Sequence, residues 1–284
     1  MTKSPGKYHR VLVAVDGSAE SFHALEQAFR LVENWITVVS VAPAYEGDLR
    51  LVGVPDPQVL MVEPCDTALQ KAQEMADAAG AMIKTVCAAG EPHERIVDLA
   101  EGESRDLIVL GAKGHSLIEK ALLGSVTRRV IGYTQRDVLV VPPGAAVGWQ
   151  KILLATDASK ASKAAADRAV DLAQAYGSEL QVAAVMEYPA QLYGEAPVPA
   201  EWRDMLLSYV EEIVDQAKSQ NIAASGLVLE GSPYGAIVAL AEEDKASLIV
   251  MGSHGRTGLK RLLMGSVTER VIGHAPCPVL VVKG

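Results

Sequence analysis

Two glycine-rich segments are the parts of this 284-residue sequence best suited to chemistry. Each has two glycines separated by two residues and then, nine residues later, a Gly-Ser pair: Gly111, Gly114, Gly124 and Ser125 in the first, and Gly252, Gly255, Gly265 and Ser266 in the second. Glycine lets a backbone approach a ligand closely, and the free amides of a helix start attract anions. The segments therefore predict phosphate-binding turns. The alternative is that the glycines only form a turn and the serine only caps a helix.

These segments differ from two well-known nucleotide motifs. Neither contains the Gly-Lys-Ser/Thr ending of the P-loop or the Gly-x-Gly-x-x-Gly of dinucleotide sites, so both classes are excluded. No Ser/His/Asp or Cys/His relay can be assembled, and no second acidic residue lies beside the glycines to activate water. We assign no catalytic residue, and dedicated hydrolysis is weakly supported.

An aspartate follows a strand-like run in each half of the chain. Asp16 ends the run Val-Ala-Val-Asp, and Asp157 ends the run Leu-Ala-Thr-Asp. Either carboxylate has two interpretations, a nucleotide contact or a helix-start residue stabilised by the helix dipole.

The elements that must position these residues occur twice. Asp16 and Asp157 are 141 positions apart, and the glycines of the two segments keep the same offset. At about 150 residues per domain, the length also predicts two domains. We place them at residues 1–142 and 151–284, with residues 143–150 as a Pro/Gly-rich linker.

Within each copy, strands and helices alternate. We expect strands at 11–15, 36–41, 81–88, 107–110 and 138–141, and at 152–156, 180–185, 222–229, 248–251 and 279–282. Helices are expected after Ser18 and Ser159, at 66–80 and 201–219, at 92–101 and 233–243, and from Ser125 and Ser266; the proline-containing stretches 45–64 and 188–199 are expected to be loops. Parallel strands need helical crossovers, so each copy is predicted to be a doubly wound α/β domain with a five-stranded parallel sheet, Rossmann-like in type.

Composition narrows the function further. The net charge of −9 opposes non-specific binding to nucleic acid or to an anionic membrane, and no apolar run is long enough to span a bilayer. The three cysteines are widely spaced, which predicts a cytoplasmic protein with no disulfide framework. His274 and Cys277 are too few for a zinc site, so no metal site is predicted, and Cys277 is expected to pack as a small apolar residue.

Over nearly its whole length the sequence resembles the universal stress protein family in its tandem form. The resemblance rests on the strand endings at Asp16 and Asp157, the runs Asp106–Gly111 and Leu248–Gly255, the two Gly-Ser-Val-Thr helix starts and the closing Cys277–Val282. The Gly-x2-Gly-x9-Gly-Ser spacing is similar to that of the ATP-binding branch. The resemblance implies the adenine-nucleotide alpha hydrolase-like fold.

The resemblance also implies the site residues. In the first copy these are Ala14, Val15, Asp16, Val41, Leu110, Gly111, Gly114, Gly124, Ser125, Val126 and Thr127. In the second copy they are Ala155, Thr156, Asp157, Val185, Met251, Gly252, Gly255, Gly265, Ser266, Val267 and Thr268. The aspartates and the strand-end valines would face ribose and adenine, and the glycine segments would hold ribose and phosphates. ATP is the expected ligand, with AMP or ADP as alternatives and Mg²⁺ only as the companion of the nucleotide.

Three function classes stay open at this point. The first is an ATP-binding regulatory or stress-response protein with an unidentified protein partner. The second is a slow ATP hydrolase or adenylyl-transferring enzyme, and the third is a partner-binding scaffold that holds cyclic AMP or nothing. As chains of the family dimerise through their last strands, we expect the two copies to form an intramolecular pseudo-dimer, with a homodimer as a further option.

Two differences between the copies predict unequal sites. The spacer between Gly255 and Gly265 contains three positively charged residues, Arg256, Lys260 and Arg261. In the matching spacer between Gly114 and Gly124, the opposite charges of Glu119 and Lys120 cancel. The cations predict tighter, more salt-sensitive ATP binding in the second copy, or else only solvate its surface. The first glycine turn also reads Ala112-Lys113 where the second reads Ser253-His254, and His254 is expected to be an exposed loop residue.

Overall fold

The chain forms two compact α/β units. The computed structural model describes residues 6–32, 35–43, 57–114, 123–187, 200–255 and 264–283, although the side chains of 57–61, 160–161 and 200 are not described. One unit, the first domain, spans Tyr8–Gly144; the other, the second domain, contains the described residues from Ala145 onward together with residues 6–7. Within the second domain Trp149, from the predicted linker, stacks on Tyr176 with ring centroids 3.9 Å apart.

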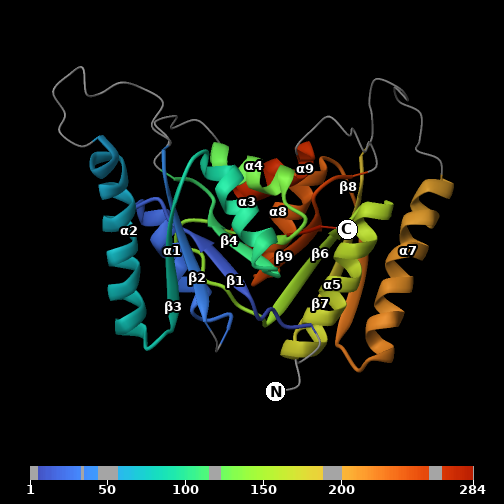
Figure 1. Ribbon diagram of the computed structural model, residues 1–284. Coiled ribbons are helices and arrows are strands. Elements are labelled where there is room, and N and C mark those ends of the chain that lie inside the picture. Colours follow the sequence, from blue (N-terminus) through green and yellow to red (C-terminus); the bar gives the residue numbers. More distant parts are fainter. Residues whose placement is uncertain are drawn as a thin grey trace. The chain divides into compact units, whose positions relative to one another are not determined.

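The first domain alternates strand and helix throughout. Its elements are β1 (Val11–Ala14), α1 (Ala19–Ala28), β2 (Ile36–Ala42), α2 (Pro57–Ala79), β3 (Ile83–Ala89), α3 (Pro92–Gly102), β4 (Leu107–Gly111), α4 (Ser125–Tyr133) and β5 (Asp137–Val141) (Figure 1). The strand order is β3-β2-β1-β4-β5 and every pairing among them is parallel. In register, Leu12 of β1 lies beside Thr37 of β2 and Ile108 of β4.

The second domain repeats this topology. Its elements are β6 (Lys151–Thr156), α5 (Lys160–Tyr176), β7 (Glu179–Met186), α7 (Ala200–Ser219), β8 (Ala224–Glu230), α8 (Pro233–Glu243), β9 (Leu248–Gly252), α9 (Ser266–His274) and β10 (Val279–Val282). The order β8-β7-β6-β9-β10 is again parallel. The predicted doubly wound, five-stranded class is confirmed for both domains.

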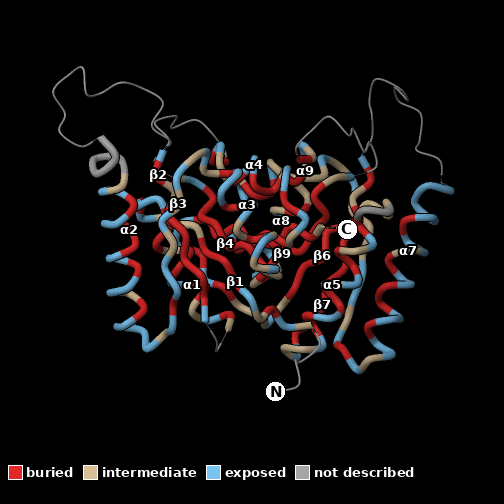
Figure 2. Tube along the Cα trace, in the orientation of Figure 1, coloured by how far each residue is buried: buried red, intermediate tan, exposed pale blue. Residues whose placement is uncertain are grey.

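Helices cover both faces of the first sheet. Helix α1 packs on β1 and β4 and α2 packs on β2 and β3, whereas α3 and α4 pack together on the other face. The central strands are consequently buried on both sides, as Figure 2 shows for β1 and β4. This is why their sequences are continuous apolar runs and not alternating ones.

The first helix of each domain begins where the sequence predicts. Ser18 is the N-cap of α1 and Ser159 the N-cap of α5, and each side chain accepts a hydrogen bond from the amide three residues on. The residue before each cap has a left-handed backbone, Gly17 with φ of 87° and Ala158 with φ of 58°. Only the first domain therefore has glycine where the turn favours it.

The expected loop 45–64 is partly wrong. Residues 44–56 and 188–199 lie outside the described residues, but α2 already begins at Pro57 and contains Pro64. Proline suits a first helical position, and a single proline further on removes only one backbone donor. The packing of α2 on β2 and β3 outweighs that loss.

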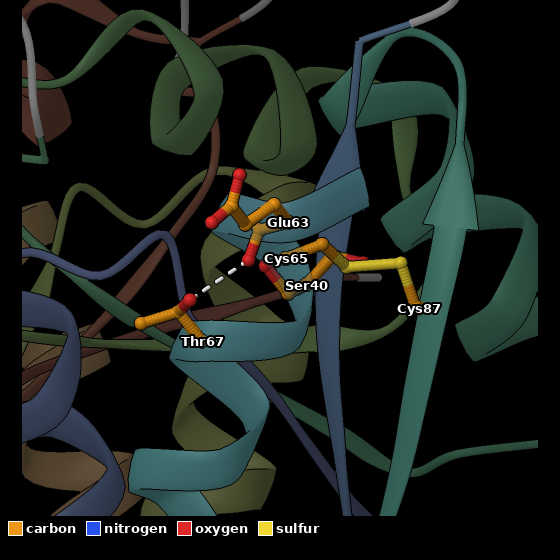
Figure 3. Close-up of a disulfide and its surroundings, with 5 residues drawn as sticks. All are labelled: Ser40, Glu63, Cys65, Thr67 and Cys87. Carbon is orange, nitrogen blue, oxygen red and sulfur yellow. Dashed lines mark hydrogen bonds between the residues drawn. A yellow bond between two sulfur atoms is a disulfide. The ribbon is translucent and has the colours of Figure 1, made fainter. Parts of the chain in front are cut away.

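The expectation of no disulfide is also wrong, because Cys65 of α2 is bonded to Cys87 of β3 with Cα atoms 6.1 Å apart (Figure 3). From Cys65 to Ala79 the helix advances about 21 Å at 1.5 Å per residue. From Gly80 to Cys87 the extended chain returns about 23 Å at 3.3 Å per residue. The helix and the returning strand thus bring two distant cysteines to the same level.

None of the described helices is both long enough and apolar enough to cross a membrane.

Candidate nucleotide-binding site

A cavity of about 330 Å³ opens in the first domain where the strand order reverses. The chain leaves β1 toward β2 and returns to β4 on the other side, so the segments after β1 and β4 separate at this point. The cavity lies between those segments, β2, α3 and the start of α4. Its volume is in the range of small-ligand pockets.

All the first-copy residues singled out from the sequence line this one cavity. They are Ala14, Val15, Asp16, Val41, Leu110, Gly111, Gly114, Gly124, Ser125, Val126 and Thr127. The cavity thus combines a strand-end carboxylate, apolar walls and a glycine turn that leads into a helix. The structure brings the predicted set together, while the role of each residue remains a prediction.

Five lining residues were not predicted. They are Ser21, Val39, Pro92, Ile96 and Lys113. Pro92 and Ile96 come from α3, for which the sequence predicted a helix and no ligand contact. Val39 lies two residues before Val41, so strand periodicity places both side chains on one face of β2 and was the available signal.

Asp16 is tied into the start of α1. Its Oδ1 accepts hydrogen bonds from the amide of Ser18 at 3.0 Å and from the hydroxyl of Ser18 at 2.5 Å. Ser18 Oγ in turn accepts from the amide of Ser21, and Ser21 Oγ lies 3.3 Å from the Asp16 amide nitrogen. The carboxylate is exposed at the cavity, so the two interpretations of Asp16 are compatible: it orders the helix start and faces the ligand space.

The glycine turn is closed by two hydrogen bonds. The amide of Gly124 donates to the carbonyl of Ala112 at 2.9 Å, and the Thr127 hydroxyl donates to the carbonyl of Gly111 at 3.0 Å. Thr127 is buried, and this bond fixes α4 to the end of β4. Helix geometry leaves the amides of the first turn of α4 without intrahelical acceptors, and they lie beside the cavity. Such amides and the helix dipole favour an anion.

The same contacts recur in the second domain. Gly265 donates to the carbonyl of Ser253 at 2.9 Å, Thr268 donates to the carbonyl of Gly252 at 3.1 Å, and the Ser159 amide donates to Asp157 Oδ1 at 3.0 Å. The other predicted residues occupy the matching element ends: Ala155 and Thr156 end β6, Val185 lies near the end of β7, Met251 ends β9 with Gly252, Gly255 follows, and Ser266 and Val267 begin α9. The described ends of the second glycine segment thus make the same contacts as those of the first.

The glycines after β4 and β9 stand against the two aspartates. A Cβ atom added at Gly114 would lie 2.2 Å from Asp16 Oδ2, and one added at Gly255 would lie 2.8 Å from Asp157 Oδ2. Neither glycine has a positive φ, so the close approach of the carboxylate, and not the backbone conformation, requires glycine here.

The charges of the two turns differ. Lys113 lines the first cavity, and its counterpart His254 is half-buried with Nδ1 3.1 Å from Ser253 Oγ, which corrects the expectation of an exposed histidine. The predicted inequality of the sites rests on Arg256, Lys260 and Arg261 against Glu119 and Lys120, all of which lie outside the described residues.

Among the residues that the structure describes, no cluster of three or more His, Cys, Asp or Glu side chains is arranged to hold a metal ion. Cys277 is 5% exposed, as expected for a packed apolar residue, and burial raises the pKa of its thiol to about 12. That thiol is therefore unreactive at neutral pH.

Comparisons with known proteins agree with this fold. The family model described as "Universal stress protein family" matches residues 7–142 and again residues 148–283. A universal stress protein of Methanocaldococcus jannaschii is 37% identical over 142 residues, which cover 48% of this chain and 82% of that protein. A universal stress protein of Mycobacterium bovis is 28% identical over 301 aligned residues, with 98% of each chain covered. The crystal structure of a universal stress protein from Archaeoglobus fulgidus has a TM-score of 0.74 at 24% identity and covers 99% of this chain and 98% of its own.

Proposed function

The chain belongs to the universal stress protein family, and we propose that it is an ATP-binding regulatory protein that holds one nucleotide in each domain with slow or no turnover. The observation that carries this proposal is the first-domain cavity, whose lining contains every first-copy residue predicted for the nucleotide. In this proposal nucleotide occupancy changes the affinity for a protein partner and so serves a stress response.

The lining residues support a place for each part of the nucleotide in this proposal. Adenine and ribose fit the apolar part between Val41, Leu110 and Ile96, with the Asp16 carboxylate available to the ribose hydroxyls. The phosphates belong at the start of α4, where amides of the first helical turn and the Lys113 ammonium supply positive charge. Mg²⁺ would be held by phosphate oxygens and water, since Asp16 is the only acidic side chain among the described residues that line the cavity.

The same residues support slow or absent turnover. Hydrolysis needs a base that activates water near the terminal phosphate. Asp16 Oδ1 already accepts two hydrogen bonds from Ser18, and the lining residues that the structure describes include no second carboxylate and no histidine. An ATP hydrolase is therefore the weaker candidate, and the release of ADP or AMP over time by purified protein would favour it.

A first experiment identifies the nucleotide that co-purifies with the protein. The purified protein is denatured, and its small molecules are separated by chromatography and identified by mass spectrometry. We expect ATP or its products ADP and AMP. Cyclic AMP alone would instead favour the scaffold class.

A second experiment assigns the nucleotide to the sites with matched variants. Gly124→Leu places a large side chain at the start of α4, and Gly265→Leu does the same at the start of α9. We expect each folded variant to bind one ATP fewer than the wild type. If both variants bind as much ATP as the wild type, the nucleotide lies elsewhere and the proposal fails.

A further inference from the structure

We propose that Cys65 and Cys87 form a reversible thiol–disulfide exchange site in the first domain, in which Cys87 is the sulfur that reacts with low-molecular-weight disulfides. This proposal goes beyond nucleotide binding and does not depend on it. The closed form ties α2 to β3, and the open form releases that tie.

The two cysteines differ in access. Cys65 is 3% exposed and lies in the third turn of α2, whereas Cys87 is an exposed residue of β3, which is the edge strand of the domain's sheet. Thiol–disulfide exchange requires attack on a sulfur that the reactant can reach. Cys87 therefore meets the external disulfide, and Cys65 completes the exchange from inside the domain.

The dithiol form also fits the structure. Cys65 Sγ lies 3.4 Å from the carbonyl oxygen of Ser40 on β2, and Ser40 is the residue that pairs with Cys87 in the sheet (Figure 3). When the disulfide is reduced, the Cys65 S–H has this acceptor in place. Reduction therefore leaves no buried polar group without a partner at Cys65.

The turn of α2 that carries Cys65 is suited to opening. Pro64 has no amide hydrogen, so one backbone hydrogen bond is missing in that turn. Thr67 Oγ1 donates to the Glu63 carbonyl at 2.9 Å in the same segment, a side-chain bond that competes with regular helix geometry (Figure 3). Each feature lowers the cost of moving Cys65 away from Cys87.

The second domain shows that packing alone does not require cysteines at these positions. By the offset of 141, Cys65 corresponds to Leu206 and Cys87 to Val228. Leu206 is buried on α7, and Val228 pairs with Ala184 in β7 as Cys87 pairs with Ser40 in β2. Apolar residues fulfil the structural role there, so the cysteine pair adds a chemical property found in one domain only.

The reaction balances with the disulfide as the oxidant. The Cys87 thiolate attacks one sulfur of the small disulfide, its S–S bond breaks, and one small thiolate leaves. The Cys65 thiolate then attacks the Cys87 sulfur, the mixed disulfide breaks, and the second small thiolate leaves. The two cysteine protons end on the two released thiols, and excess small thiol reverses both steps.

Oxidised glutathione is the probe that tests this order of events. Fully reduced wild-type protein, treated under native conditions, should lose two of its three thiols and carry no adduct. Cys65→Ser should instead accumulate a glutathione adduct on Cys87, because the resolving thiol is missing. Cys87→Ser should form at least about tenfold less adduct, because the remaining thiols of Cys65 and Cys277 are buried.

Intact-protein and peptide mass spectrometry read out each product. Equal adduct in Cys65→Ser and Cys87→Ser, or wild-type protein that keeps three thiols, would overturn the proposal. Should Cys65→Ser fail to fold, Cys65→Ala provides the same chemistry with an apolar residue. Hydrogen exchange of the wild type adds an independent readout. Amides around Cys65 should exchange faster after reduction, whereas amides of α7 should not change. Equal exchange rates around Cys65 in both redox states would show that the disulfide does not hold α2 to β3.

Discussion

Replacement of Gly114 by alanine tests the placement of the Asp16 carboxylate most sharply. The new Cβ would lie 2.2 Å from Asp16 Oδ2, so the carboxylate has to move by about 1 Å to restore ordinary van der Waals contact. Its Oδ1 is held by the amide and hydroxyl of Ser18 at 3.0 and 2.5 Å, and this movement weakens both bonds.

The cost follows from the exposure of Asp16. A hydrogen bond to a charged group contributes about 1.5–3 kcal/mol when water is excluded, and less here because water can replace the donor. We expect the free energy of unfolding to fall by about 1 kcal/mol. ATP affinity at the first site should fall about tenfold, which corresponds to about 1.4 kcal/mol.

ATP affinity is measured by calorimetric titration in a Gly265→Leu background, in which the second site is blocked and only the first can bind. Stability is measured by urea denaturation. Gly255→Ala in a Gly124→Leu background is the matched control. Its Cβ would lie 2.8 Å from Asp157 Oδ2, so the carboxylate moves less and the loss should be smaller. Gly102→Ala controls for the substitution itself, because beyond its chain neighbours and the adjacent backbone of α3 no atom lies within 4 Å of its added Cβ. If folded Gly114→Ala keeps the ATP affinity of its parent, the Asp16 position has no part in binding and the reasoning is refuted.

Four further predictions test other parts of the account. Ala158→Gly should raise the free energy of unfolding by about 0.5–1 kcal/mol in urea denaturation, because Ala158 has φ of 58° and glycine adopts that conformation without strain; a loss would contradict this. Burial raises the pKa of Tyr176 to about 12, so its contribution to the free energy of unfolding is fully present below pH 10, the ordinary tyrosine pKa, and is lost as the pH rises toward 12. Tyr176→Phe should remove this decrease from a plot of stability against pH. An unchanged plot would show that another group causes the decrease. The second site should bind ATP more tightly and lose more affinity at high salt than the first, as measured on the Gly124→Leu and Gly265→Leu variants, and equal salt slopes would make the spacer cations irrelevant. Leu280→Pro removes a backbone donor from β10 and should lower stability and change the small-angle scattering profile if the last strands of the two domains pair as predicted; an unchanged profile would exclude that pairing.

The fold could be predicted from the sequence because its signals are local and occur twice. The apolar runs that became β1 and β6 are followed by Ser18 and Ser159, which cap the next helices as expected. Most of these signals recur at an offset of 141 positions, so features shared by both copies can be separated from accidental ones. Parallel strands joined by helices leave few possible topologies, so the alternation predicted the doubly wound class, whereas the order of the strands came from the structure.

The prediction of α2 was wrong at its start for a physical reason. Prolines in the sequence indicated a loop as far as Pro64, whereas the packing of α2 on β2 and β3 stabilises a helix from Pro57. Local propensity is a weak guide where tertiary contacts are extensive. The bond between Cys65 and Cys87 was missed likewise, because only the paired lengths of α2 and β3 bring the two residues together.

The residues of the candidate site also fall into those expected from the sequence and those found only in the structure. The first-copy residues at strand ends and in the glycine turn were implied by the family resemblance, and they line one cavity. Ile96 and Lys113 were not predicted as lining residues. Ile96 belongs to a helix that follows a different strand, and Lys113 departs from the repeat. Repetition shows what the two copies share, while the features of a single copy require the three-dimensional structure.

The central claim is tested most directly by the number of ATP molecules that the wild-type chain binds. Isothermal titration calorimetry should be performed on protein freed of co-purified ligand, with Mg²⁺ present and the disulfide state fixed. The account predicts two ATP per chain, one for each glycine turn. A chain that binds neither ATP nor AMP at millimolar concentration would contradict it, and a single ATP per chain would show that only one of the two turns holds a nucleotide.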